Sequence, residues 1–119
     1  MAGSIACANS IDPIACTEEA RPALAVLVYH GFTDVGIAEG ATLVLRDGTF
    51  ADSVTSPLGF SGSAAGPLIT PNTYERAGTY SVTVRRAGYR QWDTSGVRVT
   101  EDVCHVNTLS LTARLQPLE

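Results

Sequence analysis

Hydrophobic and polar residues alternate along much of this chain, and the pattern is clearest in residues 79–86. Tyr80, Val82 and Val84 alternate there with polar residues, which is typical of a strand with one buried side and one side in water. In residues 23–30 both sides of the alternation are apolar, which predicts a strand in the middle of its sheet.

Shorter extended segments follow one another with turn residues between them. The remaining strands are expected at residues 41–46, 49–54, 67–70, 90–94 with 97–100 after a break, and 103–115. Asp47 and Gly48 predict a type I′ hairpin turn, because that turn needs positive φ. No segment has the period of a helix. The sequence therefore predicts an all-β fold, a seven-stranded antiparallel two-sheet sandwich of the Greek-key type with no substantial helix.

Length and charge narrow the possible classes of protein. The chain has 119 residues, which suits one domain, and we expect a tether at residues 1–20 followed by that domain at 21–119. The formal net charge is −4 and all eight basic residues are arginines, which argues against nucleic-acid binding and excludes lysine Schiff-base chemistry. No run approaches the roughly 18 apolar residues of a membrane span.

Three cysteines stand in the chain, and none belongs to a C-x-x-C pair, which argues against a zinc ribbon or a thioredoxin-like redox centre. We expect a disulfide between Cys16 and Cys104, and such a bond implies an oxidising compartment. Cys7 is then a free thiol, a partner for another chain, or a lipid anchor. A lipid anchor requires an apolar signal segment before the cysteine, and residues 1–6 are too short for one.

A glycine-led strand, a turn and an aromatic residue follow one another from Gly78, where the sequence reads G-T-Y-S-V-T-V-R-R-A-G-Y. This segment resembles the core signature of the carboxypeptidase regulatory-like domains, G-x-Y-x-V-x-V followed by G-Y. The matching residues are Gly78, Tyr80, Val82, Val84, Gly88 and Tyr89. Residues 40–52 resemble a second segment of the family, whereas residues 31–38 depart from its usual D-x-x-T-G-x-P. The resemblance implies a prealbumin- or transthyretin-like sandwich over residues 22–115.

The resemblance also implies a function. Domains of this family are usually attached to other proteins and have no catalytic site of their own. The expected function is therefore that of a non-catalytic accessory or interaction module, outside the cytoplasm, of a bacterial cell envelope or secreted protein. Such a module would need no cofactor or metal, and its partner would be a protein or a glycan. Its edge strands allow a monomer or a weak dimer.

A hydrolase is the most distant alternative. Transthyretin-like hydrolases use histidines, an arginine and a C-terminal Y-R-G-S, whereas this chain ends A-R-L-Q-P-L-E. Only His30 and His105, if they met across the sheets, would retain such a site. Cys104 and His105 are expected on opposite faces of one strand, which suits a shared metal badly. We expect a disulfide cysteine beside a histidine that faces solvent.

A binding function is the nearer alternative. Residues 55–72 form a long connection rich in Gly, Ser and Pro, which is a candidate surface for a glycan or a peptide. Candidate ligand contacts are Phe60, Tyr89, Trp92 and Arg90, since such rings stack on sugars and peptides. A local cluster of positive charge is formed by Arg85, Arg86, Arg90 and Arg98. Such a cluster either binds a carboxylate- or phosphate-bearing partner or balances acidic residues on a sheet face exposed to water.

Overall fold

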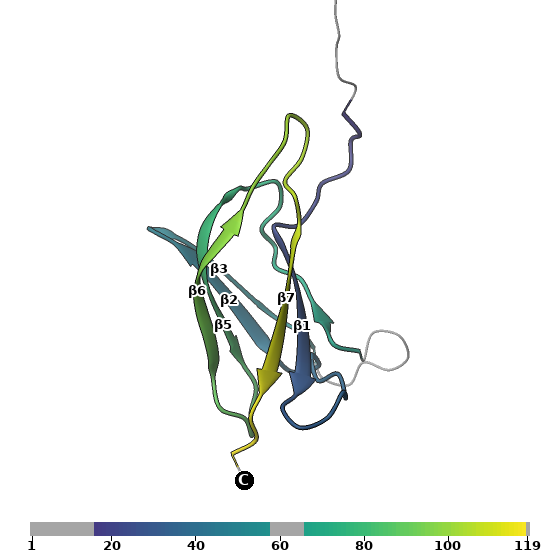
Figure 1. The fold of residues 1–119 in the computed structure, drawn as a ribbon, viewed down its shortest axis with the longest axis vertical. Coiled ribbons are helices and arrows are strands. Elements are labelled where there is room, and N and C mark those ends of the chain that lie inside the picture. Colours follow the sequence, from purple (N-terminus) through teal and green to yellow (C-terminus); the bar gives the residue numbers. More distant parts are fainter. Residues whose placement is uncertain (1–15, 58–65, 119) are drawn as a thin grey trace, which may run out of the picture.

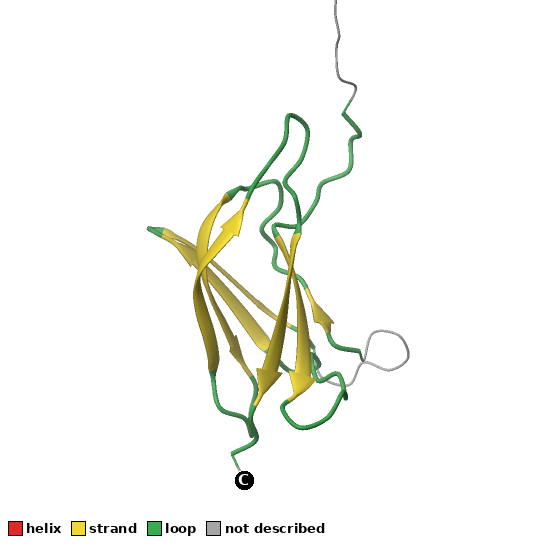
Figure 2. Cartoon of the chain, viewed as in Figure 1, coloured by secondary structure: helices red, strands yellow, loops and turns green. Residues whose placement is uncertain are grey.

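The structure, a computed structural model, describes residues 16–57 and 66–118. All regular structure in those residues is β-strand, and they contain no helix (Figure 2). The strands are β1 (Leu24–His30), β2 (Thr42–Asp47), β3 (Phe50–Thr55), β4 (Leu68–Ile69), β5 (Gly78–Arg85), β6 (Trp92–Val99) and β7 (Leu109–Leu115). They form two sheets on either side of one hydrophobic core (Figure 1).

The core confirms the alternation seen in the sequence. In β5, Tyr80, Val82 and Val84 are completely buried, and each such side chain contributes about 1.5–3 kcal/mol through burial. β5 lies inside the four-stranded sheet, whose order is β3-β2-β5-β6. β1 lies between β4 and β7 in the other sheet, so the strand with two apolar sides has the central place that its pattern predicts. The short strand expected within residues 67–70 is also confirmed, as β4.

The prediction of an antiparallel fold is wrong for one pair of strands. β1 and β7 run parallel, with Leu24 opposite Leu109 and His30 opposite Leu115. A parallel pair requires a crossover instead of a hairpin. Here β6 belongs to the four-stranded sheet, and the chain crosses to the other sheet through residues 100–108 before β7 begins (Figure 1). The remaining strand pairs are antiparallel.

The predicted hairpin exists, but its turn differs from the prediction. Asp47 pairs with Phe50, so the two-residue loop is Gly48-Thr49. Gly48 has a φ of 62° and Thr49 is not among the residues with positive φ. A type I′ turn needs positive φ at both loop residues, and the observed pattern is that of a type II′ turn.

The break expected within residues 90–100 is a bulge inside one continuous strand. The register between β5 and β6 shifts between Tyr80 and Val82, and β6 accommodates both Ser95 and Gly96 opposite one residue of β5. Gly96 has a φ of 69°, a conformation that glycine adopts without steric cost.

The last strand is shorter than the sequence predicts. β7 begins at Leu109, and residues 100–108 form a connection that is closed by a bridge between Glu101 and Val106. Val106 is buried by this connection, which explains why it does not follow the alternation of β7. The same connection carries Cys104 and His105 to the end of the molecule that residues 16–22 enter (Figure 1).

Candidate functional site

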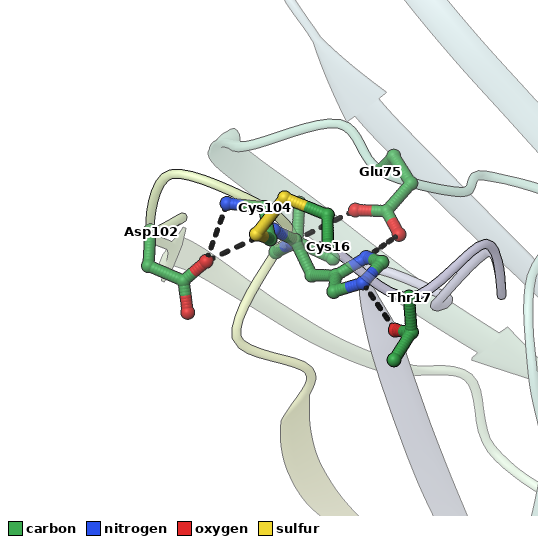
Figure 3. Close-up of a disulfide and its surroundings, with 7 residues drawn as sticks. Cys16, Thr17, Glu75, Asp102 and Cys104 are labelled. Carbon is green, nitrogen blue, oxygen red and sulfur yellow. Dashed lines mark hydrogen bonds and ion pairs between the residues drawn. A yellow bond between two sulfur atoms is a disulfide. The ribbon is translucent and has the colours of Figure 1, made fainter. Parts of the chain in front are cut away.

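Cys16 and Cys104 form the disulfide that the sequence predicts (Figure 3). Their Cα atoms are 5.3 Å apart, within the ordinary range for a disulfide, and 88 positions separate them in the sequence. The bond joins the segment before β1 to the connection between β6 and β7. It therefore fixes that segment covalently to one end of the domain.

His105 lies beside the disulfide and is buried, with 8% of its surface exposed. Its Nδ1 lies 2.6 Å from Glu75 Oε2, and its Nε2 lies 2.8 Å from Thr17 Oγ1 (Figure 3). A carboxylate only accepts hydrogen bonds, so Nδ1 donates, and in the neutral ring Nε2 accepts from the Thr17 hydroxyl. The prediction of a solvent-facing histidine is wrong, because residues 100–108 form a loop instead of a strand and turn the ring onto Glu75.

Glu75 connects three segments of the chain. Its Oε2 also accepts from the backbone N–H of Arg21 at 3.0 Å, and its Oε1 accepts from the N–H of Val106 at 2.9 Å. The N–H of Glu75 donates in turn to the Arg21 carbonyl at 2.9 Å. Glu75 has a φ of 53°, the only positive value among the described residues other than glycine. These contacts hold the backbone in a conformation that side-chain-bearing residues rarely adopt.

Asp102 shapes the turn that presents Cys104 and His105. Its Oδ1 accepts from the backbone N–H groups of Cys104 at 2.8 Å and His105 at 2.9 Å (Figure 3). Aspartate often stabilises tight turns in this way, because its short side chain reaches backbone N–H groups nearby. The bonds from His105 and Cys104 lower the pKa of the Asp102 carboxyl below its ordinary value.

The charge of Glu75 is stabilised in the folded protein. The hydrogen bond from His105 lowers the pKa of the Glu75 carboxyl, and the N–H of Val106 adds to the effect. Hydrogen bonds to the ionised form favour that form. A carboxyl whose pKa is lower in the folded state stabilises the fold above its unfolded pKa, and this contribution is lost as the pH falls through the folded pKa.

We expect Glu75→Gln to flatten the acid side of the stability profile. In the parent protein, the free energy of unfolding should decrease as the pH falls below about 4.3, the ordinary pKa of glutamate, because Glu75 becomes protonated. The variant has a similar shape but no charge to lose, so it should be less stable at neutral pH and lose less between about pH 6 and pH 3. Urea unfolding over that range measures the difference. The exposed Glu18→Gln serves as the matched control, and parallel profiles for Glu75→Gln and the parent would contradict the prediction.

The bonding order of Thr17, His105 and Glu75 is hydroxyl, imidazole, carboxylate, as in the acyl-transfer sites of hydrolases. Glu75 also accepts hydrogen bonds from the backbone N–H groups of Arg21 and Val106, so the same carboxylate joins the segment before β1 to the connection between β6 and β7. We refer to Cys16, Thr17, Glu75, Cys104 and His105 as the N-terminal clamp.

An adjacent hollow of about 380 Å³ is lined by Cys16, Thr17, Arg21, Asp102, Val103, Cys104 and His105. No cluster of His, Cys, Asp and Glu within 16–57 and 66–118 is suited to hold a metal ion.

The two histidines do not meet, and the hypothesis that they share a site is corrected. His30 is the last residue of β1, whereas His105 contacts the segment before β1, so most of the strand, roughly 20 Å, separates them. The His30 ring lies 5.8 Å from the rings of both Phe32 and Tyr89. The parallel pairing of β1 and β7 explains this arrangement, because residues 100–108 arrive at the beginning of β1 and not at its end.

The other candidate ligand contacts are scattered. Tyr89 and Arg90 lie in the turn before β6, where Tyr89 is half-buried and Arg90 is exposed. Trp92 is half-buried and packs against the core from the beginning of β6. Phe60 lies outside the described residues, as do Cys7 and most of the middle of the 55–72 connection.

Sequence reasoning misses Thr17 and Glu75, because no motif or period marks them. Thr17 meets His105 across 88 positions, and Glu75 meets it across 30. The one available signal is the disulfide, since a bond between Cys16 and Cys104 brings their chain neighbours Thr17 and His105 together.

Comparison with known proteins does not add to this description. No known protein family matches the sequence, and no curated protein matches it significantly. Within the part of the chain that the structure describes, no helix has the length and apolarity that crossing a membrane requires.

Proposed function

We propose that this chain is a disulfide-fastened β-sandwich that acts outside the cytoplasm, as a non-catalytic accessory or interaction module of a bacterial cell envelope or secreted protein. The observation that carries the proposal is the N-terminal clamp, in which a disulfide and the Thr17–His105–Glu75 hydrogen bonds fasten the same segment. Residues 1–20 act as a tether. A force on the tether is transmitted through the Cys16–Cys104 disulfide to the connection between β6 and β7 before it reaches β1. The domain therefore stays folded while it is attached.

The disulfide supports the extracytoplasmic location. Disulfides persist in oxidising compartments and are rare where glutathione and thioredoxin keep thiols reduced. Cys16 is exposed and Cys104 is partly exposed, so cellular reductants would reach this bond in a reducing compartment. The assignment to a bacterial envelope rests on the resemblance to the carboxypeptidase regulatory-like domains.

We infer the prealbumin-like, Greek-key type of fold from the same resemblance, and the division of seven strands between two sheets supports it. The residues that carry the resemblance have positions in the structure that suit their side chains. Tyr80, Val82 and Val84 are buried in the core, and Gly88, in the turn after β5, has a φ of 88°. Glycine adopts that conformation without steric cost.

The proposal is tested by non-reducing peptide mapping of the protein recovered from fractions of the cells that make it. We expect the protein in a fraction outside the cytoplasm, with Cys16 linked to Cys104. Alkylation before digestion traps free thiols, and the state of Cys7 in the same sample distinguishes a free thiol from a lipid anchor. Correctly folded protein with three free thiols in the cytoplasmic fraction would overturn the proposal.

A second candidate function is the binding of a glycan or a peptide at the opposite end of the domain from the clamp. The observation that favours it is Phe32, which is 74% exposed and extends the row of rings formed with His30 and Tyr89. The 55–72 connection approaches this end, because the Pro67 carbonyl accepts a hydrogen bond from Val28. The two functions use different ends of the domain and are compatible.

A further inference from the structure

The outward side of the four-stranded sheet is polar and positively charged. Alternate residues of β2, β3, β5 and β6 point away from the core on this side. Its hydroxyl-bearing side chains are Thr42, Ser53, Thr55, Thr79, Ser81 and Thr83, and its charged side chains are Arg46, Arg85, Arg98 and Asp93. We call this surface the arginine–hydroxyl face. Its charged residues sum to a positive value, whereas the whole chain has a formal net charge of −4.

The arginines of this face have guanidinium groups available for a ligand. Arg46, Arg85 and Arg98 are exposed, and none of their guanidinium groups forms a hydrogen bond or an ion pair within the described part of the chain. The charge of Arg85 does act on Asp93, whose pKa is lowered chiefly by hydrogen bonds from Gln91 and Thr83 and further by Arg85. Asp93 is different, because it accepts hydrogen bonds from Thr83 at 2.7 Å and from Gln91 at 3.0 Å. The Asp93 carboxylate is therefore already hydrogen-bonded, whereas the guanidinium groups of Arg46, Arg85 and Arg98 have no hydrogen-bond partner in the described residues.

Two shallow hollows meet at Arg85. One has a volume of about 230 Å³ and is lined by Val44, Arg46, Ala51, Asp52, Ser53 and Arg85. The Asp52 carboxylate is turned to the inner side, where it accepts from the Thr73 hydroxyl at 2.6 Å. The other hollow has a volume of about 320 Å³ and contains Arg85 together with Arg86 and Thr42. The first hollow thus combines the guanidinium groups of Arg46 and Arg85 with the Ser53 hydroxyl. In the second, Arg86 Nε donates to the Glu39 carbonyl at 2.7 Å and the Thr42 hydroxyl is hydrogen-bonded to that of Thr55 at 2.9 Å, so Arg85 is the main cation that this hollow offers to a ligand.

We propose that the arginine–hydroxyl face binds a linear anionic polysaccharide, whose acidic groups occupy these two hollows. A guanidinium group holds a carboxylate or a sulfate through parallel charge-assisted hydrogen bonds. Serine and threonine hydroxyls both donate and accept, which matches the hydroxyl groups of the sugar rings. The outward residues of β2, β3, β5 and β6 include no aromatic side chain, so charge and hydroxyls provide recognition in place of ring stacking.

This inference rests on the proposed function in one respect, since it identifies the partner of an interaction module. An acidic polypeptide would also pair with the arginines, but it carries few hydroxyl groups to match the rows of serine and threonine. The polysaccharide is therefore the better fit to the face as a whole.

The experiment measures binding of the oxidised full chain to polygalacturonate, dextran sulfate, uncharged dextran and poly-glutamate by titration calorimetry. We expect binding to polygalacturonate or dextran sulfate, weakening as salt is added, and no binding to dextran. The Arg46→Ala/Arg85→Ala variant should bind at least about tenfold more weakly, the scale of one lost charge-assisted pair. Arg114→Ala removes an arginine of β7, in the other sheet, and should change the affinity less than about twofold.

Each outcome decides a separate point. Binding to polygalacturonate alone identifies carboxylate recognition, and binding to dextran sulfate alone identifies sulfate recognition. Equally tight binding to poly-glutamate, an equal loss in Arg114→Ala, or no binding to either anionic polysaccharide would overturn the inference. Unfolding midpoints of all variants are compared with the parent, and Arg85→Gln replaces the double variant if that variant does not fold. Peptide mapping tests the proposed function independently. If the protein is disulfide-linked and outside the cytoplasm but binds none of these polymers, only the inference about the arginine–hydroxyl face is overturned.

Discussion

Loss of the Cys16–Cys104 bond is expected to lower the free energy of unfolding by about 4–5 kcal/mol. The bond spans 88 positions, and closing so long a loop removes much of the conformational freedom of the unfolded chain. A loss of that size corresponds to a decrease in melting temperature of about 20 °C for a domain of this length. Without the bond, the hydrogen bond between Thr17 and His105 is also weakened, because residue 17 is no longer held against the connection between β6 and β7.

Guanidinium chloride unfolding of Cys16→Ser, made in a Cys7→Ser background to prevent exchange between thiols, measures this effect. Cys7→Ser alone is the matched control and should unfold at the parent midpoint. Reduction of the parent with dithiothreitol should reproduce the behaviour of Cys16→Ser. Equal midpoints for the oxidised and reduced parent would contradict the prediction.

Tyr80→Ala is expected to destabilise the domain by about 3–5 kcal/mol. The Tyr80 side chain is completely buried, and its ring packs against Phe50 with the ring centroids 6.3 Å apart. Its hydroxyl donates to the Arg76 carbonyl at 2.7 Å and accepts from Arg76 Nη1 at 3.1 Å. Truncation therefore leaves a cavity between the sheets and removes the donor to a backbone carbonyl.

Tyr80→Phe separates the two contributions. It keeps the ring and loses only the hydroxyl, so we expect a cost of about 1–2 kcal/mol. Denaturant unfolding of both variants, with the disulfide intact, provides the comparison. A cost for Tyr80→Ala no larger than that for Tyr80→Phe would show that ring packing is not what Tyr80 contributes.

The sequence predicts most strands because their burial is local and periodic. The alternation of Tyr80, Val82 and Val84 identifies both the strand and its buried side, and the two apolar sides of β1 place it centrally. The parallel pairing of β1 with β7 is not predictable in the same way. Periodicity states which side of a strand is buried, but it does not state the direction of the neighbouring strand.

The candidate site is harder to predict than the fold. Cysteine pairing follows from simple counting, but Glu75 and Thr17 have no sequence signature, since each acts on residues far along the chain. The orientation of His105 depends on a loop where the alternation suggests a strand. A polar network of this kind depends on which loops come into contact in the folded chain. The alternation of polar and apolar residues within one segment contains little information about contacts between distant loops.

The parallel pairing of β1 and β7 also sets an order of events during biosynthesis. β1 leaves the ribosome first of the seven strands, and its full-length neighbour leaves last, because every residue from Leu24 to His30 pairs with a residue of Leu109–Leu115. Before β7 is made, β1 can pair only with β4, and only through Val26 and Leu27. The three-stranded sheet must therefore await synthesis of nearly the whole domain, and such non-local pairing folds slowly. The core between the two sheets is therefore completed only when the last strand has been made, which is compatible with the export that the proposed location outside the cytoplasm requires.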